Sequence, residues 1–334
     1  MTSHVRVPLS VLDLAVLNIA ETSGQALANT TRLAKRAEAL GYIRFWVAEH
    51  HNAPFLASTT PSVLIAHLAA NTSTMHIGSG GVMLPNHAPL VVAEQFAMLE
   101  ALHPGRIDLG IGRAPGTDPA TAAALRRTSA ALAVEDFPQH VIDVMGLLGD
   151  PITEHGMWDR FAATPKPTST PTVLLLGSSV YSAQLAGQLG LPFAYANHFD
   201  NGGTLLALDG YRNSFKASGN LETPYVIVTA NVLVADTEDH AKFLAAPGQL
   251  LVFGIRTGRF LPLMSPEEAA AHPALPMAQR MPSNRIVGAG DSVLTRLEAL
   301  LQQTGADEIM VSTSTYGIED RIHSLELLSQ YWMA

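Results

Sequence analysis

Short apolar runs alternate with segments of helical periodicity along the whole chain. A continuous apolar run bounded by turn residues is typical of a buried parallel strand, whereas apolar residues that recur every three or four positions predict a helix. Eight runs predict strands, at residues 8–14, 44–51, 75–84, 106–112, 172–176, 191–196, 225–234 and 308–313. The clearest helix start is at Thr22, where Gln25 completes a capping box.

The order of these elements predicts the fold class. Strands that alternate with helices indicate an α/β protein with a parallel sheet, and eight such units indicate a (β/α)8 TIM barrel. An open doubly wound sheet is the alternative, but its dinucleotide-binding pattern is incomplete, because Gly78 and Gly80 are followed by Met83 instead of a third glycine. No linker or break in composition divides the chain, so residues 1–334 are expected to form a single domain.

The largest insertion is predicted at residues 243–287, between the seventh and eighth strands. This segment has several Pro and Gly residues and no clear period, and connections of such length are usually lids, binding loops or disordered. As a lid it would have glycine hinges at Gly248, Gly254 and Gly258. The side chains that would cover an apolar ligand are Phe253, Phe260, Leu261 and Leu263. A static insertion packed on the barrel is the alternative.

Composition narrows the class of protein. The 334 residues carry a formal net charge of −9, and an acidic balance argues against nucleic acid as a partner. The chain has no cysteine, which excludes disulfides, zinc–thiolate sites and thiol nucleophiles. It has no signal peptide and no apolar run of membrane-spanning length, so a cytoplasmic protein is expected. Only 15% of residues are charged, which predicts apolar outer faces and a homodimer or larger assembly.

Polar residues gather where the predicted strands end. In a barrel all strands end at one mouth, which is where such folds bind ligands. These strand ends carry Glu49, His50, His51, Gly80, Gly81, Arg113, Ser178, Ser179, Asn197 and His198. Within this set, Arg113, the hydroxyls of Ser178, Ser179 and Ser182, and a helix start after Gly177 together predict an anion site, such as one for a phosphate. The plainer interpretation is a surface arginine and serines that only cap a helix.

The two adjacent histidines should differ in direction. Side chains alternate along a strand, so His50 is expected to point into the mouth and His51 elsewhere. The alternative is that His50 only holds the following loop, residues 52–58. Adjacent histidines lack the spacing of a metal-binding pair on a helix, and no metal site is expected.

Three motifs together resemble the bacterial luciferase-like flavin monooxygenases. They are the strand that ends in Glu49-His50-His51, the run GSGGVMLP at residues 78–85, and GRIDLGIGR at residues 105–113. The resemblance extends from about residue 9 to residue 332. It implies a (β/α)8 barrel that binds reduced FMN, supplied by a separate flavin reductase, at its mouth. In one branch of the family the deazaflavin F420 takes the place of FMN.

The resemblance also implies roles for individual residues. Arg113, Ser178, Ser179 and Ser182 would hold the FMN phosphate, and Gly80 and Gly81 would lie against the isoalloxazine ring, often with a cis peptide between them. His50 matches a histidine that matters for oxygenation and is the expected catalytic residue. The substrate, a small aldehyde, ketone or terpene-like molecule, would contact Glu49, His51, Asn197 and His198.

Two departures from the family's sequence pattern and two alternative functions bear on this expectation. Gly112 stands where luciferase has a cysteine, so light emission is not implied, and Asn197-His198 replaces a His-His pair of close relatives. An F420-dependent dehydrogenase would need more basic residues at the mouth than Arg113. A non-catalytic flavin-binding relative should lack His50, which is present.

Overall fold

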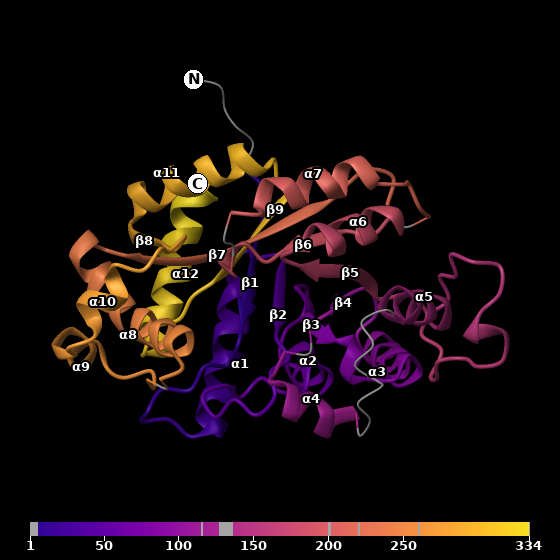
Figure 1. Ribbon diagram of the computed structural model, residues 1–334, viewed down its shortest axis with the longest axis horizontal. Coiled ribbons are helices and arrows are strands. Elements are labelled where there is room, and N and C mark those ends of the chain that lie inside the picture. The colour runs from indigo at the N-terminus through magenta and orange to yellow at the C-terminus, as the bar shows by residue number, and fades with distance from the viewer. Residues whose placement is uncertain are drawn as a thin grey trace.

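Eight parallel strands close into a barrel in the order β1-β2-β3-β4-β5-β6-β7-β9, with β9 pairing back to β1 (Figure 1). The computed structural model describes residues 6–114, 116–126, 136–199, 202–219, 221–259 and 261–333. The barrel strands are β1 (Leu9–Asp13), β2 (Arg44–Val47), β3 (His76–Met83), β4 (Ile107–Gly112), β5 (Thr172–Gly177), β6 (Phe193–Tyr195), β7 (Val226–Ala235) and β9 (Glu308–Ser312). The predicted closed barrel is therefore confirmed, and the open sheet is wrong.

Helices surround the barrel and cover the outer faces of its strands, and the short helices α9 and α10 pack on α8 away from the barrel (Figure 1). They are α1 (Ser23–Ala39), α2 (Pro61–Ala70), α3 (Pro89–Leu102), α4 (Pro119–Arg126), α5 (Phe137–Leu147), α6 (Val180–Gln188), α7 (Thr204–Ser214), α8 (Glu238–Thr257), α9 (Pro266–Ala271), α10 (Leu275–Gln279), α11 (Gly290–Thr304) and α12 (Ile318–Trp332). The capping box before α1 is confirmed: the Gln25 N–H donates to Thr22 Oγ1, and the Gln25 side chain accepts from the Thr22 N–H. No helix in the described ranges is both long enough and apolar enough to cross a membrane.

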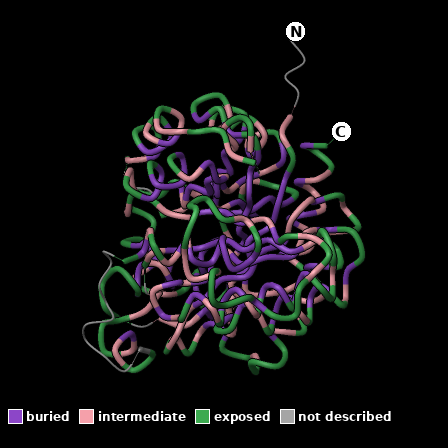
Figure 2. Tube along the Cα trace, turned by 90° about the vertical axis from the view of Figure 1, so that its right-hand side faces the viewer, coloured by how far each residue is buried: buried purple, intermediate pink, exposed green. Residues whose placement is uncertain are grey.

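Buried side chains fall into an outer layer and an inner layer. Figure 2 shows the buried segments in the centre of the molecule and the exposed ones mostly around them. The outer layer lies between strands and helices, where Phe45 and Val47 of β2 pack. The inner layer lies inside the barrel, where Trp46 packs with Leu12, Leu174, Ala194, Ile227 and Met310. Because strand side chains alternate, one strand supplies both layers.

A buried ion cluster lies near the amino ends of the strands. Arg44 donates to Asp108 at 2.7 Å and to Glu308 at 3.1 Å, and both carboxylates are fully buried. Tyr225 donates to Glu308 at 2.8 Å. Burial alone would raise the pKa of Asp108, but Arg44 and hydrogen bonds from His76 and Trp46 hold it below its ordinary value. The cluster closes the end of the barrel opposite to the mouth.

The insertion between β7 and β9 is regular instead of loop-like. It comprises α8, α9, α10, a short strand β8 (Ile286–Ala289) and α11. Its largest apolar cluster includes Leu250 and Phe253 of α8, so Phe253 packs within the insertion. The expected position of the insertion is confirmed, but its expected irregularity is wrong, because α8 continues through Pro247 and Gly248. Phe260 lies outside the described residues, and movement of the segment as a lid stays a prediction.

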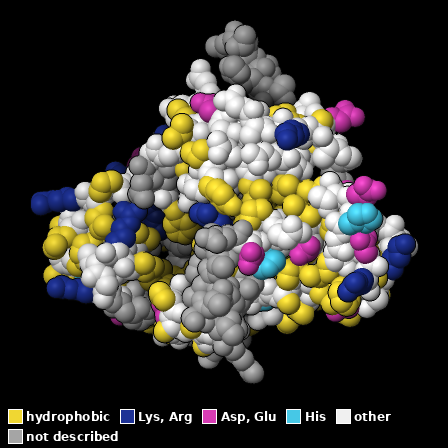
Figure 3. Space-filling model, turned by 45° about the vertical axis from the view of Figure 1, so that its right-hand side comes forward, with side chains coloured by type: hydrophobic (Ala, Val, Ile, Leu, Met, Phe, Trp, Pro, Cys, Tyr) yellow, Lys and Arg dark blue, Asp and Glu magenta, His cyan; other side chains and the backbone are white. Residues whose placement is uncertain are grey.

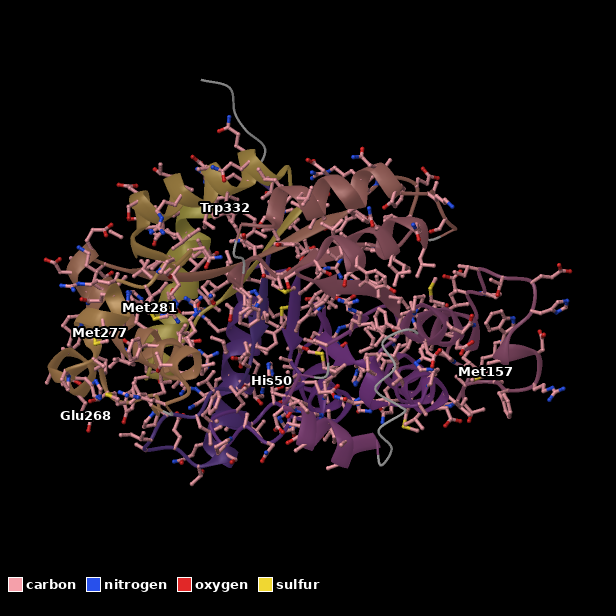
Figure 4. The ribbon with its side chains drawn as sticks, in the orientation of Figure 1. His50, Met157, Glu268, Met277, Met281 and Trp332 are labelled. Atoms are coloured by element: carbon pink, nitrogen blue, oxygen red, sulfur yellow. The ribbon has the colours of Figure 1, made fainter. Side chains whose placement is uncertain are left out.

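β7 connects the insertion to the barrel. Its first residues pair with β6 and β9, and its last four, Val232 to Ala235, pair with β8. One strand of ten residues therefore pairs first with the two barrel strands β6 and β9 and then with β8 of the insertion. The insertion lies at the left of Figure 1, and Figure 4 labels Met277 and Met281 there, with His50 near the centre of the molecule.

Candidate active site

A cavity of about 270 Å³ opens at the carboxyl ends of the strands. Ligand pockets typically span roughly 300–1,000 Å³, so this one is close to the lower end of that range. Apolar side chains line its inner part, among them Leu12, Trp46, Leu176, Ala194 and Met310. The polar residues that line it are His50, Arg113, Ser178, Ser179, Ser182, His198 and Thr229. The strand ends therefore enclose a cavity, as expected. Its inner part is apolar, and polar residues line the rest of it.

The end of β2 divides its side chains between the cavity and the protein interior. Trp46, Ala48 and His50 line the cavity, whereas Glu49 and His51 do not. This is the period of two expected for a strand that continues past Val47. The predicted divergence of His50 and His51 is therefore found in the structure.

Glu49 is a buried carboxylate with four hydrogen-bond donors. It accepts from His51 Nε2 at 2.8 Å, from His87 Nε2 at 2.9 Å, from Asn86 Nδ2 at 3.2 Å and from the Met83 N–H at 2.9 Å. Burial alone would raise the pKa of Glu49, but the bonds from His87, His51 and Met83 hold it below its ordinary value. Glu49 therefore ties the end of β2 to the segment after β3 and does not face the cavity.

His50 presents an unpaired imidazole to the cavity. Its backbone N–H donates to the Ser58 carbonyl at 3.1 Å, so the main chain already holds the following loop. Within the described ranges the imidazole makes no hydrogen bond, and its Nδ1 is buried without a partner. Burial lowers the pKa of His50, with His51 adding to that effect and Glu49 opposing it. A neutral ring with an unpaired nitrogen is suited to bind or exchange a proton with a bound molecule.

His198 forms part of another wall, and its tautomer is fixed. Thr229 Oγ1 donates to the Tyr195 carbonyl at 3.1 Å, so it accepts from the Nδ1–H of His198. Nε2 of His198 then carries a lone pair. Burial lowers the pKa of His198 to about 4, and nearby His50 contributes to that shift. Both cavity histidines are therefore uncharged at neutral pH.

The residues of the predicted anion site come together where α6 begins. Ser179 caps α6 and accepts from the Ser182 N–H at 3.4 Å, so the positive end of the helix points toward the cavity. The Arg113 guanidinium lies 4.5 Å from the ring centre of Tyr181, on the first turn of the same helix. Among the described residues it makes no ion pair with a carboxylate. A cation, three hydroxyls and a helix start thus share one end of the cavity.

Gly80 and Gly81 bring bare backbone to the cavity wall. The peptide between them is cis, as the resemblance implied. The register of β3 against β4 shifts between Gly80 and Val82. A Cβ on Gly81 would lie 2.7 Å from the Gly110 carbonyl oxygen, closer than a side chain can approach. The bulge and close approach predicted from these glycines are both present.

Asn197 is buried and does not line the cavity. Its Oδ1 accepts from Thr204 Oγ1 at 3.0 Å, and its carbonyl accepts from the Asn284 side chain. It joins the end of β6 to the start of α7 and to the insertion. Of the four residues expected to contact substrate, only His198 lines the cavity.

Comparison with known proteins identifies the family. The sequence profile described as "Luciferase-like monooxygenase" matches residues 7–308. The chain belongs to the luciferase-like monooxygenase family. A luciferase-like monooxygenase of Escherichia coli strain K12 is 43% identical over 334 residues, covering 96% of this chain and 96% of that protein.

Solved structures agree with this assignment to the luciferase-like monooxygenases. The crystal structure of apo-MsnO8 has a TM-score of 0.89 and 35% sequence identity, covering 98% of both chains. The oxygenating constituent of 3,6-diketocamphane monooxygenase from Pseudomonas putida, in complex with FMN, has a TM-score of 0.72 and covers 98% of both chains. Because the diketocamphane monooxygenase constituent is 20% identical in sequence, its similarity to this chain shows a shared fold and nothing more.

Two cavity residues of this luciferase-like monooxygenase escaped the sequence analysis. Thr229 lies in the middle of a strand whose only other polar residue is Asn231, and a hydroxyl facing the inside of a barrel is a signal that could have found it. Trp46 was expected in a strand, but nothing in the sequence says that its ring would form part of the cavity wall. Its neighbours there, Leu12 and Met310, come from strands distant in the sequence.

Proposed function

We propose that this chain is a flavin-dependent monooxygenase that uses reduced FMN and O2 to oxygenate a small organic molecule. One observation carries the proposal. An anion-binding end, with Arg113 and three serines, shares an apolar cavity with an unpaired His50 nitrogen. A cofactor with a phosphate and a flat ring fits such a cavity, and His50 is then left to face the reacting atoms.

The residues around the cavity suit FMN in detail. Arg113, Ser178, Ser179 and Ser182 would hold its phosphate, and the bare backbone of Gly80 and Gly81 would meet its ring. The diketocamphane relative is itself described in complex with FMN. Reduced FMN, when bound, supplies the electrons with which O2 is activated.

The protein's own contribution lies in its cavity walls. Leu12, Trp46 and Met310 exclude water from the inner part. His50, neutral and unpaired, is the group that would hold or transfer a proton beside the substrate. His198 offers an acceptor at Nε2. Three further residues contribute indirectly, by holding in place the segments that carry the two cavity histidines: Glu49, His51 and Asn197.

Partners and assembly follow from the same proposal. The diketocamphane relative is the oxygenating constituent of its enzyme, which supports a separate reductase as the source of reduced FMN here.

Exposed apolar side chains on α2 and α3, such as Val63 at 68% and Leu102 at 61%, support a homodimer. Figure 3 shows hydrophobic side chains in a broad band across one face of the molecule. We further propose a single domain that works in the cytoplasm, where a chain without cysteine needs no oxidant.

Cofactor binding and turnover test the proposal in turn. The protein would be mixed with FMN, riboflavin or F420 and the complexes weighed by native mass spectrometry. FMN should bind, and riboflavin more weakly because it lacks the phosphate, whereas binding of F420 alone would overturn the choice of cofactor. Oxygen and NADH consumption with a flavin reductase, over a panel of aldehydes, ketones and terpenoids, then tests monooxygenation. Light scattering at micromolar concentration tests the dimer.

A further inference from the structure

A second, smaller cavity lies at the same mouth and was not expected from the sequence. Its volume is about 20 Å³, room for a few atoms. The polar residues that line it are Asn231, Arg285, Ser312 and Ser314. None of them belongs to the proposed flavin site, and Arg285 comes from the insertion, directly before β8.

Strand register places this small cavity above the main one. Thr229 and Met310 are paired and line the main cavity, while Asn231 and Ser312 are paired two residues further along the same strands. Residues two apart share a face of the strand and lie roughly 6.6 Å apart. The small cavity is therefore one layer of side chains closer to the rim, over the β7 and β9 walls.

The chain around Arg285 also borders the wall that carries His198. The Asn284 side chain donates to the carbonyl of Asn197, the residue directly before His198. The insertion thus crosses the rim at this point and carries its next side chain, Arg285, to the same side of the mouth. The anion site proposed for the FMN phosphate lies on other elements, β4, β5 and α6.

The guanidinium of Arg285 occupies space left by a glycine and has no hydrogen-bond or ion-pair partner among the described residues. It lies against α8, where a Cβ on Gly248 would be 2.9 Å from Nη2 and 3.2 Å from Nη1. Over the residues that the structure describes, it makes neither an ion pair nor a hydrogen bond. Burial, with a smaller contribution from Arg256, lowers the pKa of Arg285 to about 10, which leaves it charged at neutral pH. Arg285 is partly exposed and its guanidinium has no counterion among the described residues, so it is available to a bound anion.

We propose that Arg285 binds a carboxylate of the organic substrate, so that this enzyme acts on small organic acids. The inference rests on the proposed monooxygenase function, since it assigns a second arginine of the mouth, besides Arg113, to the molecule that is oxygenated. The planar guanidinium matches a carboxylate, and a space this small suits a planar group better than a phosphate. Ser312 and Ser314 are hydroxyl donors on the same wall.

Binding of matched acids and amides tests the assignment. The FMN-loaded protein would be titrated calorimetrically with straight-chain carboxylates from butanoate to decanoate and with the corresponding amides. At least one acid should bind roughly tenfold to a hundredfold more tightly than its amide, as expected for a charge-assisted pair. Arg285→Gln should remove this preference and Arg285→Lys should keep part of it. Arg280→Gln, an exposed arginine of the same insertion, should bind like the parent.

Each outcome decides for or against the carboxylate site. Equal binding of acids and amides by the parent, no binding of any acid, or an unchanged preference in Arg285→Gln would overturn it. Gly248→Ala provides a second variant that keeps Arg285, since the added Cβ would lie 2.9 Å from its Nη2 and displace the end of its side chain, while also approaching the Ser314 carbonyl oxygen to 3.2 Å. It should weaken acid binding without affecting FMN. Affinity for FMN is measured separately, so its absence in the parent would count against the proposed function and not against Arg285 alone.

Discussion

The indole Nε1 of Trp46 donates a hydrogen bond of 2.9 Å to Asp108 Oδ2. Trp46 lines the cavity, and Asp108 belongs to the buried ion cluster at the opposite end of the barrel. The wall of the candidate active site is therefore anchored directly to a group of buried charges whose arginine partner, among the described residues, is Arg44. This hydrogen bond therefore contributes both to the stability of the barrel and to the shape of the cavity.

Arg44→Met should strongly destabilise the protein. It leaves the carboxylates of Asp108 and Glu308 buried without their shared cation, and breaking a buried pair in this way typically costs about 3–5 kcal/mol. Urea unfolding measures the change. The matched control is Arg32→Met, which removes the exposed pair with Glu319 and should change stability by less than about 1 kcal/mol. Similar losses in the two variants would mean that the buried cluster has no special weight.

Arg113→Ala should weaken FMN binding more than tenfold. Charge-assisted bonds to a phosphate are worth about 1.5–3 kcal/mol, and no carboxylate in the described chain competes for this guanidinium. A fluorescence titration with FMN measures the effect, with riboflavin as the control ligand because it has no phosphate. Riboflavin affinity should hardly change. Equal weakening for both ligands would show that Arg113 supports the cavity instead of the phosphate.

His50→Ala should abolish product formation while leaving the fold and FMN affinity intact. Its imidazole makes no hydrogen bond within the described ranges, so little structure depends on it. General acid–base catalysis commonly contributes about a hundredfold or more, and the electrons of reduced flavin should instead appear as released hydrogen peroxide. Product yield, peroxide and melting temperature would be measured together.

His51→Ala is the comparison for His50. His51 donates to buried Glu49 and does not line the cavity, so its removal should lower the melting temperature more than it lowers the rate. Full coupled turnover by a stable His50→Ala protein would remove His50 from the mechanism.

Protein stability should depend on pH through His198. Burial lowers its pKa to about 4 from an ordinary value of 6.5. Between these values the unfolded chain binds a proton that the folded chain does not, so stability rises with pH and is lost as pH falls from 6.5 toward 4. One such group contributes a slope of at most about 1.4 kcal/mol per pH unit.

Urea unfolding between pH 4 and pH 7 checks the contribution of His198. His198→Gln should give a shallower slope than the parent, with His50 and other groups retaining their own contributions. His67→Gln, on the exposed side of α2, should follow the parent. A pH profile of His198→Gln that runs parallel to the parent would contradict the assignment.

Much of the barrel, and the residues that line its mouth, could be predicted from the sequence. Polar groups are costly inside a barrel, so the polar residues that follow apolar strands mark the mouth, as His50, Arg113 and Ser178 do. The glycines of β3 likewise predicted the bulge that the register records. These signals are local, because each depends on a residue and its immediate neighbours.

What could not be predicted depends on contacts between distant segments. Glu49 looked like a cavity residue, and only the folded chain brings Asn86 and His87 to its carboxylate. The residues of α8 around Pro247 suggested a broken segment, but packing within the insertion keeps the helix continuous. A sequence also cannot tell that Arg285 makes no ion pair with any described carboxylate, because that is a property of its neighbours in space.

The seam between β1 and β9 has a consequence for how this protein is made. Leu9 pairs with Ile309, so the barrel is closed by residues three hundred positions apart in the chain. Trp46 and Leu12 are synthesised early, yet Met310 completes their layer only when β9 has left the ribosome. Until then the nascent chain exposes an unclosed sheet with free strand edges, which are prone to wrong pairing. Folding of the cavity is therefore a late event, and a chain stalled before Glu308 should depend on chaperones and lack the cavity at the mouth.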